Sequence, residues 1–364
     1  MKVLFMTNIP APYRVVFFNK LAKMCDLTVL FEKEKTAVRN KTWFQSNKFD
    51  FKYIMLSKRK IKTLFETLDE DYDLIIMGVY STKIAAIARF YLKFKRKKYI
   101  ISADGGFVHD KYILTKFIKT FFISSASYWL SSGKETTKYL KYYGANIQNI
   151  YEYHFTSICE EDIIMSPIEY SKKMKLRKKL GLECDKLFLS IGQINYRKGY
   201  DILIETIKKY NLKNAAFVIA GDGKNLEEYK NFILENNIQN VYFVGFKNKK
   251  EIEMLYKAAD VFLFPTRYDI WGLVINEAMA YGLPIISSNG AISSNELLLQ
   301  TNLYNPDDKK TLSNLIKKYS DMDIRELHAE GAKNIEIIKS YTIEKMVDDH
   351  ITIFKQIMEK EGKI

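Results

Sequence analysis

Cysteine, histidine and proline are scarce in this chain of 364 residues, which contains three cysteines, four histidines and six prolines. The cysteines Cys25, Cys159 and Cys184 are odd in number and widely spaced. They therefore form neither a disulfide framework nor a cluster of metal ligands, and they favour a reducing compartment. The sequence predicts no metal site.

Long uninterrupted hydrophobic runs are absent as well. Residues 1–7 form one short apolar run that lacks the length and the cleavage site of a signal peptide. The most hydrophobic window, residues 112–130, is interrupted by Lys116, Lys119 and a serine-rich turn, which argues against a membrane-spanning helix. We therefore expect a cytoplasmic protein, either soluble or peripheral at the inner face of the cell membrane.

The composition is that of a globular protein, with 47% hydrophobic and 27% charged residues, and the length suggests two domains. Of the net charge of +14, the first 150 residues carry +15, because they contain 27 basic and 12 acidic residues. A basic half can attract nucleic acid, anionic lipid or phosphorylated substrates. Composition alone does not choose among these partners.

Short runs rich in Val, Ile, Leu, Phe and Tyr alternate with helical patterns along both halves, which predicts parallel strands with helical crossovers. The expected strands are 3–6, 27–31, 53–56, 74–79, 99–102 and 128–131, then 187–191, 216–220, 241–244, 261–264 and 284–287. We expect a first domain at 1–165, a second at 166–342, and a C-terminal helix at 343–364 that could either close the second domain or cross back onto the first. Two such units imply a ligand cleft at the carboxyl ends of their strands.

The segment 264–284 (FPTRYDIWGLVINEAMAYGLP) is expected to form a strand, a polar turn and a helix. Exposed N–H groups at a helix start bind phosphate well, so this helix start is a candidate diphosphate cradle. The cradle comprises Trp271, Gly272, Leu273 and Val274. Glu277 follows one to two turns later and could accept two ribose hydroxyls, while Asp269 could accept hydroxyls of a sugar. The alternative is an ordinary helix start with a solvated Glu.

A second junction, 187–199 (LFLSIGQINYRKG), places Arg197 and Lys198 before a new helix. Two cations there suit a diphosphate, although they could equally be solvated loop residues. Two glycine turns after strands are weaker signals. Gly221 and Gly223 could contact a nucleotide or only form a turn, and Gly245 with Phe246 could meet a base.

These segments together resemble family 4 of the retaining glycosyltransferases, which have the GT-B fold. The resemblance covers nearly the whole chain and rests mainly on GQINYRKG, VIAGDG, VYFVGF and PTRYDIWGLVINEAMAYGLPII. It implies an α/β fold of two facing, doubly wound Rossmann-like domains with a cleft between them, in which the second domain binds the donor and the first the acceptor.

The resemblance also implies roles for single residues. The family has two Glu eight positions apart, at Asp269 and Glu277 here, and the shorter Asp reaches less far towards a donor sugar. Gln193 stands where the family usually has an Arg, whereas Lys198 is kept. We therefore expect Arg197 or Arg267 to supply the missing charge at the diphosphate.

Two loops of the first half, 8–14 (NIPAPYR) and 102–110 (SADGGFVHD), follow strands and are expected to face the cleft. Asp104 and His109 are the catalytic candidates there. His109 could orient or deprotonate an acceptor hydroxyl, or be a loop histidine without a catalytic role. His154 near the hinge is a weaker candidate.

Residues 111–122 (KYILTKFIKTFF) place apolar side chains on one helical face and Lys111, Lys116 and Lys119 mainly off it. Such a helix lies either on a membrane surface or against the protein core. The basic run 93–98 (KFKRKK) and the positive first half favour weak association with anionic membranes.

By resemblance, the chain would transfer a sugar from a nucleotide-diphosphate-sugar, with a UDP-sugar as first choice and a GDP-sugar as second. The acceptor would be a saccharide or a lipid-linked oligosaccharide in capsule, exopolysaccharide or lipopolysaccharide synthesis, and no further cofactor is required. One alternative is a nucleotide-sugar epimerase of the same fold. Another is a basic nucleic-acid-binding protein, although no nucleic-acid module is recognised. An oxidoreductase would need Gly-x-Gly-x-x-Gly after the first strand, which residues 8–14 do not provide.

Overall fold

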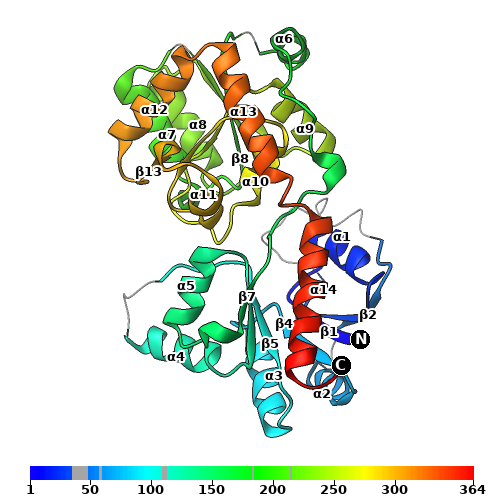
Figure 1. Ribbon diagram of the computed structural model, residues 1–364. Helices are drawn as coiled ribbons and strands as arrows, with labels where there is room; N and C mark the ends of the chain where they lie inside the picture. The colour runs from blue at the N-terminus through cyan, green and yellow to red at the C-terminus, as the bar shows by residue number, and fades with distance from the viewer. Residues whose placement is uncertain (35–47, 57–59, 109–112, 183, 214) are drawn as a thin grey trace. The chain divides into compact units, whose positions relative to one another are not determined.

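The chain folds into two compact units, each built on one parallel sheet (Figure 1). The computed structural model describes residues 1–34, 48–56, 60–108, 113–182, 184–213 and 215–364. Unit 1 comprises Met1–Ser157 together with Thr342–Ile364, and unit 2 comprises Ile158–Tyr341. The predicted α/β class with two Rossmann-like units is confirmed.

In the described part of unit 1, seven strands form a sheet in the order β3-β2-β1-β4-β5-β6-β7. The strands are β1 (Lys2–Thr7), β2 (Asp26–Phe31), β3 (Lys52–Met55), β4 (Leu74–Met77), β5 (Ile100–Ala103), β6 (Tyr128–Ser131) and β7 (Ile150–Glu152). The helices are α1 (Pro12–Leu21), α2 (Lys60–Asp69), α3 (Lys83–Phe94), α4 (Ile113–Ile123), α5 (Lys134–Tyr142) and, from the end of the chain, α14 (Ile343–Lys360).

In the described part of unit 2, six strands follow the order β10-β9-β8-β11-β12-β13. They are β8 (Leu187–Ile191), β9 (Ala216–Ala220), β10 (Val241–Gly245), β11 (Val261–Phe264), β12 (Ile285–Ser288) and β13 (Leu303–Tyr304). The helices are α6 (Tyr170–Lys179), α7 (Tyr200–Tyr210), α8 (Leu226–Glu235), α9 (Lys249–Ala258), α10 (Leu273–Ala280), α11 (Ile292–Leu297), α12 (Lys309–Asp321) and α13 (Ile324–Ile338).

The central strands form because their sequences are apolar without alternation. All residues of β4, β8, β9 and β11 are buried, as expected for parallel strands covered on both faces. The eleven strands that the hydrophobic runs predict are all present. The edge strands β7 and β13 were not predicted, since three residues or fewer are too short to give a periodic signal.

Both sheets have the strand order of a doubly wound fold, in which the connections reverse direction at the centre of the sheet. The reversal lies between β1 and β4 in unit 1 and between β8 and β11 in unit 2. Within each pair, the loops at the carboxyl ends of the two strands run to opposite faces of the sheet. This leaves a crevice between them, where ligands bind in such folds. The loops after β8 and β11 are therefore the first place to look for a site in unit 2.

Buried ion pairs attach α6 to the opposite, amino-terminal edge of the unit 2 sheet. Arg177 and Asp260 are 0% and 1% exposed, and Lys173 lies 3.3 Å from Asp260. Arg177 also donates to the carbonyl of Ala258 at 2.9 Å, and Asp260 accepts the N–H of Leu187 at 2.9 Å. The network binds the backbone at the start of β8 and just before β11, so it holds the beginnings of these strands in place. The burial is tolerated because each buried charge has a partner.

The helix α14 packs against α1 within unit 1. His350 of α14 is 1% exposed, and its ring centroid lies 4.8 Å from that of Phe17 and 4.6 Å from that of Tyr153. Its Nδ1 is 2.7 Å from the carbonyl oxygen of Met346. Burial lowers the pKa of His350 from 6.5 to about 4. The imidazole therefore stays neutral well into the acidic range.

This pKa predicts acid sensitivity of the α1–α14 packing. Below pH 6.5 the unfolded chain protonates this histidine and the folded chain does not, so stability is lost as the pH falls towards 4. Between about pH 7 and about pH 5, the wild-type free energy of unfolding should fall by about 2 kcal/mol more than that of His350→Phe. Urea unfolding at both pH values measures this. Equal losses in the two proteins would show that His350 does not titrate in this way.

Candidate functional site

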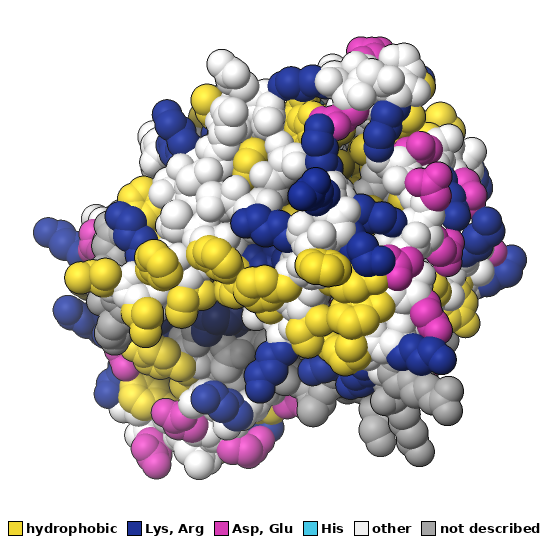
Figure 2. Space-filling model, turned by 90° about the horizontal axis from the view of Figure 1, so that it is seen from below, with side chains coloured by type: hydrophobic (Ala, Val, Ile, Leu, Met, Phe, Trp, Pro, Cys, Tyr) yellow, Lys and Arg dark blue, Asp and Glu magenta, His cyan; other side chains and the backbone are white. Residues whose placement is uncertain are grey.

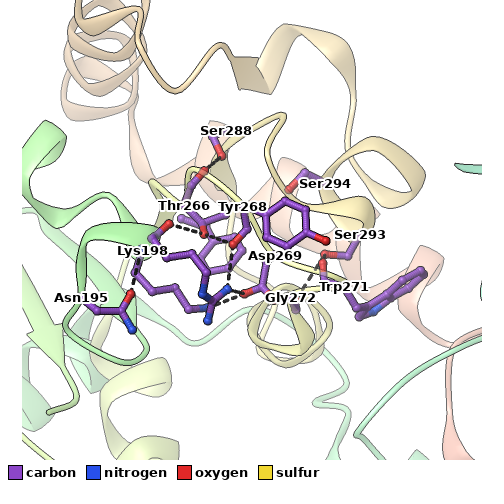
Figure 3. Close-up of polar contacts among 12 residues, drawn as sticks. Asn195, Lys198, Thr266, Tyr268, Asp269, Trp271, Gly272, Ser288, Ser293 and Ser294 are labelled. Carbon is purple, nitrogen blue, oxygen red and sulfur yellow. Dashed lines mark hydrogen bonds and ion pairs between the residues drawn. The ribbon is translucent and has the colours of Figure 1, made fainter. Parts of the chain in front are cut away.

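The loops after β8 and β11 meet at the reversal point of the unit 2 sheet (Figure 3). The backbone N–H of Arg267 donates to the carbonyl of Arg197 at 2.8 Å, and the Thr266 hydroxyl donates to the same oxygen at 3.2 Å. The Lys198 ammonium forms an ion pair with Asp269 across the two loops. Lys198 and Asp269, predicted from separate motifs, are thus brought into contact.

Local contacts hold Lys198 in this position. Asn195 caps the short turn before it and accepts the N–H of Lys198 at 3.2 Å. The Lys198 ammonium also lies 4.7 Å from the ring centroid of Phe264, and the residue is only 8% exposed. These contacts restrict the flexible Lys198 side chain, so its ammonium group is already held in this position in the absence of a ligand.

Arg197 and Arg267, the two candidates for the missing diphosphate cation, lie in different environments. Arg197 donates to the carbonyl of Tyr268 at 2.7 Å and approaches Asp269 to 3.5 Å, so it lies beside Lys198. Both terminal nitrogens of Arg267 bind Asp201, at 2.8 and 2.7 Å. Arg197 is therefore the better placed of the two, while Gln193 lies in the same loop after β8.

The helix α10 begins beside this cluster. Gly272 precedes it with a φ of +98°, and a Cβ atom there would lie 2.9 Å from the Phe264 ring, so only glycine fits. Ser293 fixes the turn by donating to the carbonyl of Trp271 at 2.6 Å. The first N–H groups of a helix have no acceptor within it, so Leu273 and Val274 can present theirs to an anion.

Glu277 lies on α10 and is held by a residue that the sequence did not single out. Tyr256 of α9 donates its hydroxyl to Oε2 of Glu277 at 2.9 Å. Tyr256 is 1% exposed and stacks on Tyr281 with ring centroids 5.1 Å apart. Burial and the charge of Glu277 raise the pKa of Tyr256 well above its usual value, so it remains a hydrogen-bond donor. In sequence, Tyr256 resembles any apolar helix position, and no local signal marks it.

The glycine turn after β9 has a packing role. A Cβ atom at Gly221 would lie 1.9 Å from the carbonyl oxygen of Gly192, and one at Gly223 would lie 2.2 Å from that of Ile194. Gly221 also donates its N–H to the carbonyl of Gly245 at 2.9 Å. The loops after β8 and β9 thus touch, which explains Gly221 and Gly223 sterically. Gly245 has a φ of +73°, and a Cβ atom there would meet no other atom within 4 Å. Phe246 follows β10 and is 41% exposed.

Serine side chains from the end of β12 and from α11 complete the polar cluster, and these were also missed. Ser288 donates to the carbonyl of Thr266, and the hydroxyls of Ser287 and Ser294 are 2.8 Å apart. The N–H of Asp269 donates to the carbonyl of Gly290 at 2.8 Å. The repeated Ser-Ser-Asn of 287–289 and 293–295 was the available signal.

In unit 1, Asp104 follows β5 and binds Arg14 at the start of α1. The Arg14 guanidinium contacts the carboxylate, and Tyr153 donates its hydroxyl to Oδ1 at 3.1 Å. Although burial opposes it, the charge of Asp104 raises the pKa of Arg14, so the guanidinium stays ionised. Asp104 is thus held by two neighbours, with its side chain 25% exposed. His109 lies outside the described residues.

His154, the weaker candidate, follows β7 and pairs with α14. Its Nδ1 is 2.7 Å from Oδ2 of Asp349, and its backbone N–H donates to the same oxygen at 3.0 Å. Although burial opposes it, these hydrogen bonds lower the pKa of Asp349. The pair attaches the end of β7 to α14, which is a structural role.

The unit 2 cluster suits a phosphorylated ligand that also carries hydroxyls. Lys198, Arg197 and the start of α10 offer positive charge and N–H donors, whereas Glu277 and Asp269 offer carboxylate acceptors. Within the ranges that the structure describes, no three His, Cys, Asp or Glu side chains are grouped to hold a metal ion.

Known sequences are similar to this part of the chain. Residues 172–337 match the family model for glycosyl transferases group 1. The uncharacterized glycosyltransferase MJ1607 of Methanocaldococcus jannaschii is 27% identical over 202 residues, which are 54% of this chain and 52% of the relative. The O-antigen biosynthesis glycosyltransferase WclY of Escherichia coli is 29% identical over 144 residues, 38% of this chain and 40% of WclY. The chain spans about half the length of the first of these relatives and less of the second.

Solved structures of similar fold cover all or nearly all of the chain. Anabaena Alr3699/HepE, in complex with UDP and glucose, has a TM-score of 0.76 at 18% identity, with 100% of both chains covered. The apo form of the lipopolysaccharide outer core galactosyltransferase WaaB has a TM-score of 0.70 at 16% identity, over 98% of this chain and 100% of WaaB. These likenesses confirm the GT-B fold class, and with the family match they support a group 1 type of glycosyltransferase.

The Arg14–Asp104 pair generates a stability prediction for unit 1. Asp104→Asn should lower the free energy of unfolding by roughly 2 kcal/mol, because it leaves a buried guanidinium without its carboxylate. The double variant Arg14→Met/Asp104→Asn should recover part of this loss, since neither charge remains. Denaturant unfolding of the wild type, both single variants and the double variant measures the coupling. Losses that simply add would show that the two side chains act independently.

Proposed function

We propose that the chain is a retaining glycosyltransferase of family 4 that transfers a sugar from a nucleotide-diphosphate-sugar to a saccharide acceptor. The observation that carries this proposal is the ion pair of Lys198 with Asp269, in the loop that leads into α10, at the reversal point of the unit 2 sheet. A diphosphate needs cations and N–H donors close together, and this site combines them.

In the proposed donor complex, each side chain has a distinct task. Lys198 and Arg197 bind the diphosphate, and the N–H groups of Leu273 and Val274 add donors. Asp269 orients Lys198 and accepts a hydroxyl of the donor sugar. As the bond to the sugar breaks, charge grows on the leaving diphosphate, and donors fixed in advance stabilise that charge strongly.

Glu277 would recognise the ribose of the nucleotide. An ionised carboxylate has about four acceptor positions on its two oxygens, so it can accept two vicinal hydroxyls beside the Tyr256 hydrogen bond. Glu277 lies farther along α10 than the helix start that would bind the diphosphate. Because the ribose is attached to the diphosphate in a nucleotide, the two groups could contact these two neighbouring parts of the helix. Phe246, exposed after β10, is the candidate contact for the base.

Related proteins support the substrate class. HepE was solved with UDP, with UDP and glucose, and with UDP-glucose, which favours a UDP-sugar over a GDP-sugar as donor. WclY acts in O-antigen biosynthesis and WaaB in the lipopolysaccharide outer core, as their names state. We therefore place the reaction in the synthesis of a surface polysaccharide, with a saccharide or lipid-linked oligosaccharide as acceptor bound by unit 1 near Asp104.

The donor site is tested by nucleotide binding to Glu277→Gln. The neutral amide keeps the shape but loses the charge that strengthens hydroxyl hydrogen bonds, so we expect about tenfold weaker UDP binding. Isothermal titration with UDP and GDP measures the affinities. Glu336→Gln on α13 is the matched control, because Glu336 is 71% exposed and forms an ion pair with neighbouring Lys339.

Two results would contradict the donor site. One is equal UDP affinity of the Glu277→Gln and Glu336→Gln variants. The other is a wild-type protein that binds neither nucleotide.

The Tyr256 hydrogen bond gives a second, independent prediction. Tyr256→Phe removes only the hydroxyl, so Glu277 loses one donor and its orientation. We expect UDP affinity to fall about three- to tenfold, in line with one hydrogen bond of about 1 kcal/mol. Titration with UDP measures the affinity, and circular dichroism checks that the variant is folded. If a folded Tyr256→Phe variant bound UDP as tightly as the wild type, the Tyr256 hydrogen bond would not be needed for UDP binding by Glu277.

A further inference from the structure

Hydrophobic side chains of α3 and α4 in unit 1 are exposed instead of joining the core. The exposed fractions are 82% for Phe94, 89% for Ile113, 71% for Leu114 and 70% for Phe117. Of the eleven residues of α4, all described, Ile123 alone is buried. We define the α3–α4 surface by seven exposed residues: Phe90, Phe94, Ile113, Leu114, Phe117, Ile118 and Phe121. For residues 111–122 the sequence left two interpretations, a helix on a membrane surface and a helix against the protein core. The second is wrong for α4, because its apolar face is exposed.

The charged side chains on α3 and α4 themselves have one sign. The sequences of α3 and α4 contain five basic residues and no Asp or Glu. The basic residues are Lys83, Arg89, Lys93, Lys116 and Lys119. Figure 2 shows hydrophobic side chains gathered across the lower face of the molecule, with lysine and arginine side chains around them. The surface therefore combines apolar contact area with a positive rim.

A buried cation lies between the two helices. Arg89 of α3 is 4% exposed, and its guanidinium carbon lies 3.5 Å from the ring centroid of Phe122 on α4. Among the described residues, its Nε and Nη1 have no hydrogen-bond partner. Burial lowers the pKa of Arg89, but a guanidinium remains charged in proteins. A positive charge that no described carboxylate pairs with is costly to bury, and an anion at this surface would stabilise it.

We propose that the α3–α4 surface docks on an anionic lipid bilayer. The apolar side chains enter the boundary between headgroups and acyl chains, and the cations lie among the anionic headgroups. A second copy of the chain fits poorly, because two such surfaces would bring like charges together without carboxylates. Within the described residues, no helix has the length and hydrophobicity to cross a bilayer, so the contact lies at the surface. This inference does not depend on the proposed sugar transfer.

Vesicle binding by matched variants tests the inference. The protein is sedimented with vesicles of phosphatidylcholine alone and with vesicles that also contain phosphatidylglycerol. The wild type should bind only the anionic vesicles, and Leu114→Ser/Phe117→Ser should bind them at least about tenfold more weakly. Leu234→Ser is the control, because Leu234 on α8 of unit 2 is 74% exposed, close to the exposure of Leu114. Both variants change exposed positions, so thermal unfolding should match the wild type.

Salt dependence and oligomeric state complete the test. Raising the salt from about 0.1 M to about 1 M shortens electrostatic reach to roughly 3 Å, so binding to anionic vesicles should weaken. The inference is overturned if the wild type does not bind anionic vesicles, or if Leu114→Ser/Phe117→Ser and Leu234→Ser bind them equally. It is also overturned if the wild type is a dimer by light scattering that Leu114→Ser/Phe117→Ser dissociates.

Discussion

Parallel pairing of the strands is the constraint on which the candidate site depends. Every strand pair described in unit 2 is parallel, so each connecting helix returns the chain to the same edge of the sheet. The loops that follow the strands therefore collect at the carboxyl-terminal edge. Lys198 after β8 and Asp269 after β11 are 71 positions apart in sequence, yet the register of β8 with β11 brings them into contact. The donor chemistry proposed here is a consequence of that register.

Buried charges do different work at the two edges of this sheet. At the amino-terminal edge, Arg177 and Asp260 are fully enclosed and bind backbone groups, so they can only support the fold. At the carboxyl-terminal edge, the side chains of Lys198 and Asp269 are 10% and 18% exposed, and a ligand can reach them. An ion pair that is fully buried thus stabilises the fold, whereas an ion pair that is partly exposed to solvent is available to bind a ligand. In unit 1, Asp104 is partly exposed, so its ion pair with Arg14 is also of the type that a ligand can reach.

The two units differ in how they use positive charge. In unit 2, cations are confined by loop contacts at one site, which suits the localised charge of a diphosphate. In unit 1, cations are spread over α3 and α4 beside exposed aromatic and aliphatic side chains, which suits an extended anionic surface. The excess of +15 in the first 150 residues is therefore consistent with a surface role more than with one binding pocket.

The class of fold and most strands could be predicted from the residues alone, because continuous apolar runs separated by helical patterns are typical of buried parallel sheets. The sequence also indicated Lys198, Asp269, Gly272 and Glu277, since these follow strands or begin a helix and such positions depend on local spacing. Their roles in binding stay predictions. Contacts between distant segments became visible in the folded chain alone: Arg267 with Asp201, Tyr256 with Glu277, and Arg14 with Asp104. The tertiary structure also decided that the apolar face of α4 is exposed, because a helical pattern shows which residues share a face but not what covers that face.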